Sequence, residues 1–266
     1  MKTALCYSGQ IGAFNKAFNN QKLSFLYDCD DVYSYTSNLI THKVLSLPMG
    51  LAFAKFKRTS DVHKYLEGGV GWRKNIGTYG VVYKVKNELV EDQLSFIKDK
   101  LKKSIIEDES LEDTLQDSNL SKWEWLKKRQ LWKMYSCNNL IEDDYDIVVR
   151  CRFEFCPYLK IPIKEIYKNY NDKNKIFVFG GWNCVPPMVF MDEFFCDGFA
   201  FGSPKAMNVF TSLYLQKDAY PFDTKYKECW DKYGDNVEYQ LKKHLEKHNI
   251  ELVYIGNKRS MYNLER

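Results

Sequence analysis

Cysteine and histidine are too few and too scattered in this sequence to predict a zinc site. The eight cysteines include no CxxC pair, and only four histidines are available to complement them. Structural zinc sites need closely spaced thiolate and imidazole ligands, so a site of the ordinary type is not expected. Several cysteines fall inside predicted strands or helices, where a thiol behaves as a small buried hydrophobe. We therefore expect reduced cysteines and a cytoplasmic location.

Long apolar runs and common nucleotide-binding signatures are also missing. No stretch approaches the roughly 18 consecutive apolar residues of a transmembrane helix, and the apolar run after Met1 is too short for a signal peptide. Neither GxGxxG nor a GK[ST] phosphate-binding loop follows the first predicted strand, which argues against a Rossmann oxidoreductase. The net charge of +4 suits anionic ligands but falls short of a dedicated nucleic-acid binder.

What the chain does contain is an alternation of strand and helix patterns over 266 residues, 45% of them hydrophobic. Strands are predicted at 3–7, 31–35, near 88–91, at 145–154, 175–179 and 250–255, the last of the chain. Helices are predicted at 14–26, 92–103, from Ser121 onward and at 235–245. This order predicts an α/β fold with a mostly parallel sheet flanked by helices. The second half mixes short strands and loops, as in a mixed α+β subregion.

Two segments are expected to lack regular structure. The first runs from about 36 to 79 and contains the glycine-rich, basic stretch Gly68–Lys74. That stretch is either a mobile loop over an active site or an excursion without a role. The second, 107–117, is acidic and poor in apolar residues, which predicts a solvated loop.

The segment Tyr145–Glu154 combines an apolar, β-branched run with three charged residues. In a strand, side chains at i, i+2 and i+4 share one face, so Arg150, Arg152 and Glu154 are expected to line up. Arginine forks bind phosphate oxygens, and a carboxylate holds a divalent cation. The pattern therefore indicates a site for a phosphate-bearing ligand with a metal. The alternative is a salt-bridge ladder on the surface of an edge strand.

Two further positions are candidates for a site. Ser8-Gly9-Gln10 follows the first predicted strand and precedes a helix, a layout that brings backbone N–H groups to a ligand. A plain turn that needs Gly9 for its dihedral angles is the alternative. Asp197 stands between apolar residues and next to a glycine. It is either a functional group at the rim of a pocket or a turn-forming residue.

These motifs together resemble a group of GT-A-like glycosyltransferases found in large viruses, phages and bacterial surface-polysaccharide clusters. Ser8-Gly9-Gln10 is similar to the SGQ opening of that group, and residues 145–154 resemble its YDxVxRxRxD motif. Asp197–Ser203 is similar to its DxFAxGS element. The resemblance spans nearly the whole chain, with further similar segments at Asp31–Tyr33, Tyr83–Val85, Leu89–Gln93 and the helix of Val237–Leu245.

The resemblance implies one domain over 1–266, with a nucleotide-sugar-binding half (1–155) and an acceptor-side half (156–266). It implies sugar transfer from a nucleotide-diphosphate sugar to a hydroxyl group, with Mn²⁺ or Mg²⁺ held by Glu154. If the reaction inverts, the implied catalytic base is Asp197, followed by Glu193 and Asp192. The implied nucleotide-sugar-binding residues are Ser8, Gly9, Gln10, Arg150, Arg152, Lys258 and Arg259.

Two departures from the group's pattern bear on the site. The group has an arginine shortly after SGQ, where this chain has Ile11-Gly12-Ala13. One phosphate contact is therefore lost, or is supplied by Arg73, Lys74, Lys258 or Arg259. The last acidic residue of the motif is Glu154 in place of aspartate, and its extra methylene shifts the carboxylate, which leaves a strict metal requirement open.

Two other functions stay open at this point. The chain could be a catalytically inactive module that binds a nucleotide-sugar, or another nucleotide-dependent α/β transferase such as a nucleotidyltransferase. The acceptor of a glycosyltransferase is equally open. A surface glycan, a lipid-linked sugar, a protein side chain or a hydroxymethylated DNA base would all fit, and nucleic acid is a partner only in the last case. No stable membrane insertion is expected.

Overall fold

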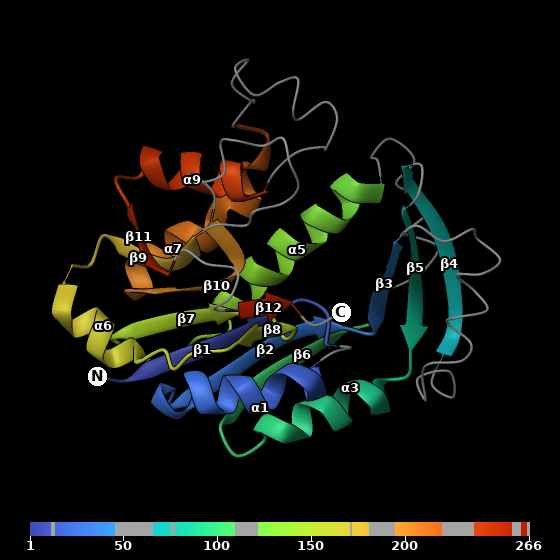
Figure 1. Ribbon diagram of the computed structural model, residues 1–266, viewed down its shortest axis with the longest axis horizontal. Helices are drawn as coiled ribbons and strands as arrows, with labels where there is room; N and C mark the ends of the chain where they lie inside the picture. Colours follow the sequence, from blue (N-terminus) through green and yellow to red (C-terminus); the bar gives the residue numbers. More distant parts are fainter. Residues whose placement is uncertain are drawn as a thin grey trace.

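The protein is built on a sheet of seven strands (Figure 1). The computed structural model describes residues 1–11, 14–45, 66–75, 78–109, 122–170, 172–180, 195–219, 237–256 and 262–264. From one edge to the other, the strands are β11 (Glu251–Gly256), β9 (Lys175–Gly180), β10 (Phe195–Gly202), β7 (Ile147–Cys151), β1 (Thr3–Ser8), β2 (Asp31–Ser37) and β6 (Leu101–Glu107).

The directions of the strands create an opening for a ligand. β6, β2, β1 and β7 run parallel, β11 runs parallel to β9, and β10 is antiparallel to both of its neighbours. The chain travels outward from β1 through β2 to β6 and then returns to the other side of β1 as β7. Connections on the two sides of β1 therefore diverge at its carboxyl end. Ligands of open α/β sheets bind in the crevice that such a reversal leaves.

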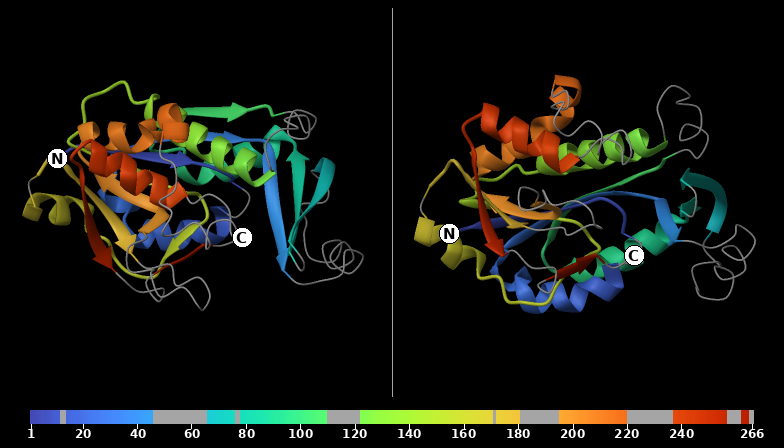
Figure 2. Two further views of the ribbon diagram at one scale, coloured as in Figure 1. Left: turned by 90° about the horizontal axis from the view of Figure 1, so that it is seen from above. Right: turned by 45° about the horizontal axis from the view of Figure 1, so that its top comes forward.

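Helices cover both faces of the sheet (Figures 1 and 2). One face carries α1 (Phe14–Ser24), α3 (Asn87–Leu94) and α6 (Ile163–Tyr170), and the other carries α5 (Lys122–Asn138), α7 (Pro204–Thr211) and α9 (Val237–Lys247). Along β1, Leu5 and Tyr7 pack toward the α1 face, whereas Ala4 and Cys6 pack toward the α5 face. This alternation with a period of two lets one strand serve both cores. The predicted α/β fold, with a mostly parallel sheet flanked by helices, is confirmed.

A second sheet stands beyond the carboxyl edge of the first (Figure 1). It consists of β3 (Leu39–Leu45), β5 (Thr78–Val85) and β4 (Leu66–Asn75), all antiparallel, and β3 begins two residues after β2 ends. The prediction of irregular structure over 36–79 is therefore wrong for these strands, and Gly68–Lys74 belongs to β4. Glycine lowers the local preference for a strand, but pairing with β5 satisfies the backbone groups and outweighs that preference.

The segment around residue 90 also differs from the prediction. The expected strand near 88–91 is helix α3, and the expected helix at 92–103 is divided into a short 3₁₀ helix, η3 (Ser95–Ile97), and strand β6. β6 is an edge strand with largely exposed side chains, so its sequence lacks the apolar run of a buried strand. The strand at the end of the chain differs too, because β11 is followed by β12 (Tyr262–Leu264), which pairs with β8 (Phe155–Pro157).

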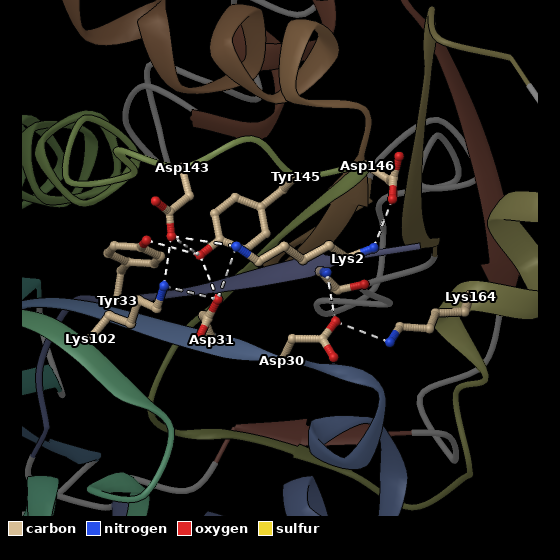
Figure 3. Close-up of polar contacts among 10 residues, drawn as sticks. Lys2, Asp30, Asp31, Tyr33, Lys102, Asp143, Tyr145, Asp146 and Lys164 are labelled. Carbon is tan, nitrogen blue, oxygen red and sulfur yellow. Dashed lines mark hydrogen bonds and ion pairs between the residues drawn. The ribbon is translucent and has the colours of Figure 1, made fainter.

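The amino-terminal edge of the sheet is held by a network of charged and phenolic side chains (Figure 3). The Tyr145 hydroxyl donates to Asp31 Oδ2 at 2.7 Å and lies 3.0 Å from the Tyr33 hydroxyl. Asp146 accepts the backbone N–H of Lys2 at 2.7 Å. Burial, reinforced by Tyr33 and Asp31, raises the pKa of Tyr145, so its hydroxyl stays protonated and can donate. The first two residues of the 145–154 motif therefore connect β7 to β1 and β2.

Among the described residues, no helix combines the length and the apolar character needed to cross a membrane. The described cysteines are buried and unbridged: Cys6, Cys29, Cys137, Cys151, Cys156 and Cys196.

Removing the Tyr145 hydroxyl tests the role of this amino-terminal network. We expect Tyr145→Phe to lower the free energy of unfolding by about 1–2 kcal/mol, because Asp31 loses a buried hydrogen bond. Urea unfolding monitored by circular dichroism measures the change. Tyr158→Phe is the matched control, since the Tyr158 side chain is exposed, and should leave the midpoint unchanged. Equal midpoints for Tyr145→Phe and wild type would contradict the assignment.

Candidate functional site

Three distant segments meet at the carboxyl end of β1. In the sheet, Arg150 of β7 lies in register with Cys6 of β1 on one side and with Ala200 of β10 on the other. The backbone N–H of Arg152 donates to the carbonyl of Gly198 at 2.9 Å. The sheet register thus brings the end of the 145–154 motif against the segment of Asp197.

Only the first of the three predicted charged residues lies within the strand. β7 ends at Cys151, and residues 152–155 form a turn in which the N–H of Phe155 donates to the carbonyl of Arg152 at 3.1 Å. The expected i, i+2, i+4 alignment along one strand is therefore wrong for Arg152 and Glu154. The turn nevertheless brings the side chains of Arg152 and Glu154 into contact. Between them, the ring of Phe153 is fully buried in the core and anchors the turn.

Arg152 connects two buried carboxylates. Its Nε donates to Glu154 Oε1 at 2.7 Å, and its Nη1 lies 3.5 Å from Asp197 Oδ2. Gln130 of α5 also donates its amide to Asp197 Oδ2. Burial disfavours the charge of Arg152, but Glu154 and Asp197 outweigh that effect and raise its pKa. Arg152 is therefore a fixed cation with two protein partners.

Arg150 differs sharply from Arg152 because it is buried without such partners. Its side chain is only 1% exposed, and none of its three guanidinium nitrogens has a hydrogen-bond partner among the described residues. Its register neighbours Cys6 and Ala200 belong to the core beneath α5, so Arg150 lies on that face. Burial lowers the pKa of Arg150, and the nearby charge of Asp197 opposes this shift. A buried guanidinium in this position is costly unless an anion pairs with it.

The alternative of an edge-strand salt-bridge ladder does not fit Arg150. β7 lies between β10 and β1 in the middle of the sheet, and Arg150 is not at the surface. Two other buried polar atoms in this region also have no hydrogen-bond partner among the described residues, namely Ser8 Oγ and Glu154 Oε2. The polar atoms left unsatisfied at the carboxyl end of β1 and β7 thus include a donor group and acceptors, as a polar ligand would require.

The turn after β1 needs its glycine for conformation. Gly9 has φ +119°, a region that side-chain-bearing residues rarely adopt, and beyond its chain neighbours no atom of the described residues lies within 4 Å of the position that a Cβ would take. Its N–H donates to Tyr35 O at 3.3 Å, and its carbonyl accepts from Thr36 Oγ1 at 2.8 Å. Gly9 thus turns the chain while leaving free space beside its backbone. The predicted contact of Ser8, Gly9 and Gln10 with a nucleotide stays a prediction.

Asp197 lies inside a strand and not in an Asp-Gly turn. β10 spans Phe195–Gly202, and its pairing with β9 shifts register between Phe195 and Ala200. The turn interpretation is therefore wrong, because the strand continues through Gly198, whose carbonyl accepts the N–H of Arg152 just after β7. Glu193, Asp192, Lys258 and Arg259 lie outside the described residues, as does Ser121.

In another polar cluster, two cations of α5 contact carboxylates. Lys133 of α5 is buried, donates to Ser37 Oγ at 2.5 Å and lies 2.7 Å from Glu109 Oε1. Arg129 also pairs with Glu109, at 2.9 Å, and with Glu107. The prediction of a solvated acidic loop is thus wrong for Glu109, because two cations on α5 draw it into the interior. Residues 110–117 of that segment lie outside the described part.

Two polar residues near the site, Gln130 and Gln21, were not predicted from the sequence. Gln130 on α5 donates its amide to Asp197. Gln21 on α1 is fully buried and bonds the turn at 152–155. Neither residue belongs to a motif. The one sequence signal for these residues is a glutamine at a helix position that the periodicity turns toward the core.

The carboxylates of the site provide a limited set of ligands for a metal. Within the described ranges, no group of three or more His, Cys, Asp or Glu side chains is placed to hold an ion. Glu154 nevertheless has a buried, unpartnered oxygen, and Asp197 lies on the other side of Arg152. A divalent cation bound mainly by phosphates and water needs only one or two carboxylates. The divalent metal stays a prediction, for which Glu154 would supply a ligand.

Comparison with known proteins provides little beyond the geometry. No protein-family model matches the chain, and no curated protein matches its sequence. Among solved structures, mouse xyloside xylosyltransferase 1 in its apo form is similar with TM-score 0.40 and 8% identity, over 96% of this chain and 84% of that one. The 4-diphosphocytidyl-2C-methyl-D-erythritol synthase from Anaerococcus prevotii DSM 20548 has TM-score 0.45 and 7% identity, over 98% and 88%. Likenesses this weak carry no weight for the function.

The Glu109 cluster makes a testable prediction about pH. Burial disfavours the Glu109 carboxylate, but Lys133 and Arg129 outweigh it and lower its pKa below the ordinary value of 4.5. A lowered folded-state pKa contributes stability above pH 4.5 that is lost as pH falls toward the folded-state pKa. We expect Glu109→Gln to be less stable than wild type at pH 7. The difference in the free energy of unfolding should shrink as the pH falls below 4.5.

Urea unfolding at a series of pH values measures the effect. Glu91→Gln removes an exposed carboxylate of α3 and should match wild type throughout. A stability difference for Glu109→Gln that stayed constant down to the acid limit would show that the pairing of Glu109 is not its source.

Proposed function

We propose that the protein is a glycosyltransferase that moves a sugar from a nucleotide-diphosphate sugar to a hydroxyl acceptor. The observation that carries this proposal is the buried guanidinium of Arg150, which has no hydrogen-bond partner among the described residues. It lies one residue before the carboxyl end of a central parallel strand, next to the reversal in strand order where ligands of α/β sheets bind. The SGQ and RxRx(D/E) resemblance supports the same assignment.

A diphosphate is the anion that suits this arrangement. Arg150 and Arg152 carry two positive charges, and Glu154 and Asp197 carry two negative charges, so the group is formally neutral. Arg152 is already paired with both carboxylates, which leaves Arg150 as the cation to be matched. Guanidinium groups bind phosphate oxygens through paired N–H donors. Ser8 Oγ, which is also buried and unpartnered, adds a hydroxyl at the adjacent strand end.

The charge of the leaving group explains why cations are needed. As the bond from the anomeric carbon to the phosphate oxygen breaks, the nucleoside diphosphate takes the electron pair and gains negative charge. Preorganised positive groups stabilise that charge without reorganisation. In the proposed reaction Arg150 serves this purpose, and Arg152 adds to it where its carboxylate partners permit. A divalent cation held by Glu154, with Asp197 nearby, would supply further neutralisation of the phosphates.

Asp197 is the proposed base if the reaction inverts. The acceptor oxygen forms the new bond to the anomeric carbon, and its proton passes to the carboxylate. Gln130 and Arg152 both contact Asp197 Oδ2, and these two contacts orient the carboxylate. A retaining enzyme would not need this base. Glu193, the second candidate, lies outside the described residues.

A second candidate function is a binding module without catalysis. The observation in its favour is that Asp197 and Glu154 are both engaged by Arg152, so neither carboxylate is fully free. In such a module the same residues would bind the nucleotide-sugar and release it unchanged. The donor, the acceptor, the cytoplasmic location and the division into halves at residue 155 stay predictions under either function.

Replacing Arg150 separates a ligand-binding role from a structural one. We expect Arg150→Met to abolish nucleotide binding while leaving stability unchanged or raising it by up to about 2 kcal/mol, because a buried charge without partners disfavours folding. Lys133→Met is the matched control, since Lys133 is a buried cation that contacts both Glu109 and Ser37. It should lose about 2–3 kcal/mol. Urea unfolding and calorimetric titration with UDP or GDP measure both effects. Strong destabilisation in Arg150→Met with binding retained would refute the proposal.

A nucleotide-sugar screen tests the function directly. We expect at least one UDP- or GDP-sugar, with Mn²⁺ or Mg²⁺ present, to raise the melting temperature, because a ligand at a hundred times its Kd stabilises by about 2.7 kcal/mol. Donor hydrolysis or transfer in the same mixtures, lost in Asp197→Asn, identifies the enzyme. Binding without turnover favours the inactive module. The absence of any shift with nucleotides or nucleotide-sugars would remove both functions.

A further inference from the structure

Gln21 of α1 makes an unusual set of hydrogen bonds in the core. Its side chain is fully buried, and its amide nitrogen donates to Phe155 O at 2.6 Å and to Phe153 O at 3.0 Å. The carbonyl of Arg152 lies at the limit of bonding, 3.5 Å away. On the other side, the hydroxyl of Tyr7 donates to Gln21 Oε1 at 2.5 Å. One amide thus reaches the carbonyls of the turn that follows β7.

The turn at 152–155 needs this amide because it has left the seven-stranded sheet. β7 ends at Cys151, so the carbonyls of Phe153 and Phe155 do not take part in its pairing with β1, and Phe155 begins β8, which pairs with β12 in a separate sheet. Buried carbonyl groups without a donor cost free energy comparable to a lost hydrogen bond. Gln21 supplies donors to these carbonyls. It therefore stabilises a backbone conformation that the sheet alone does not hold.

The same turn is anchored a second time by an aromatic ring. Phe153 is fully buried and stacks on Tyr7, with ring centroids 5.0 Å apart and planes 15° apart. Tyr7 therefore contacts the turn through its ring and contacts Gln21 through its hydroxyl. The residues on either side of Phe153 are Arg152 and Glu154, whose side chains pair with each other and, for Arg152, with Asp197. The contacts of Phe153 and Gln21 in the core thus support the turn whose other side chains, Arg152 and Glu154, lie at the site.

The chemistry of the amide makes glutamine specific for this position. Carbonyl oxygens can only accept, so the group facing them has to be an N–H donor, and the opposite end has to accept from Tyr7. A glutamate at this position would place a carboxylate against two carbonyl oxygens. A methionine would fill the volume without donating, and an asparagine is shorter by one methylene.

We propose that Gln21 is a positioning residue that fixes the turn carrying Arg152 and Glu154, and thereby sets the geometry of the phosphate-binding group. The link to phosphate rests on the function proposed above. Gln21 does not touch the ligand in this scheme. It acts through the backbone of residues 152–155, and Tyr7 orients its amide.

The experiment compares two full-length variants in which methionine replaces a buried glutamine. Gln21→Met removes the donors to the turn. Gln93→Met removes a hydrogen bond from another buried glutamine, whose Oε1 accepts the N–H of Asn15 at 3.0 Å at the start of α1. Hydrogen exchange is measured by mass spectrometry on peptides covering 14–18 and 152–157. Affinity for inorganic pyrophosphate is measured by calorimetric titration.

We expect Gln21→Met to speed exchange in 152–157 and to weaken pyrophosphate binding by roughly tenfold, the scale of one lost buried hydrogen bond. Gln93→Met should speed exchange only in 14–18 and keep the wild-type affinity. Unchanged exchange in 152–157 of Gln21→Met would overturn the positioning role. So would faster exchange spread evenly over the whole sheet, which would show a merely global effect.

The two proposals fail in different ways. If wild-type protein bound no pyrophosphate, the proposed function would fall, while hydrogen exchange would still decide whether Gln21 holds the turn. If Gln21→Met did not fold, Tyr7→Phe would take its place, because it removes only the hydroxyl that orients the amide. It should produce the same local increase in exchange to a smaller extent. Exchange in 152–157 equal to that of wild type would then overturn the proposal.

Discussion

The pairing of one buried cation is the constraint on which the site depends. Arg150 lies in the middle of the sheet, beneath α5, where water does not provide the solvation that a guanidinium requires. Its neighbours Asp197 and Glu154 offset part of that cost through their charge, yet neither gives it a hydrogen bond. Lys133 on α5, by contrast, is a buried cation that contacts both Glu109 and Ser37. The lack of such partners at Arg150, among the described residues, is the observation on which the proposed anionic ligand rests.

The motif at 145–154 serves two purposes at opposite ends of one strand. Tyr145 and Asp146 hold the amino-terminal edge, where they bind Asp31 and the backbone of Lys2. Arg150 and the turn after it supply the charged groups at the carboxyl edge. The three core residues Ile147, Val148 and Val149 of β7 lie between these ends and keep them in a fixed relation. A contiguous sequence motif thus combines a structural contact with a candidate binding group.

Several errors of the sequence analysis share a physical cause. β3 pairs with β5, a segment far from it in the chain, and β4 pairs with the same strand from the other side, so the three strands depend on forming one sheet. β6 is an exposed edge strand. Helix α3 covers 87–94, so it begins a few residues before the predicted helix at 92–103. Local patterns report local preference, and pairing between distant segments decides such cases. Asp197 is the same kind of case, because its Asp-Gly sequence favours a turn but β10 continues through it.

The sequence by itself determined the strands β1, β2, β7, β9 and β11, the α/β class, and the three charged residues Arg150, Arg152 and Glu154 as candidates for one site. Apolar periodicity and residue chemistry are local properties, and they can be read directly. Only the tertiary structure decided that Arg150 is buried without a hydrogen-bond partner among the described residues, and that Arg152 pairs with Asp197. It also decided that Gln130 and Gln21 support the site. The burial of a side chain and its hydrogen-bond partners depend on which segments of the chain come into contact. Those contacts form only on folding and cannot be read from a local pattern.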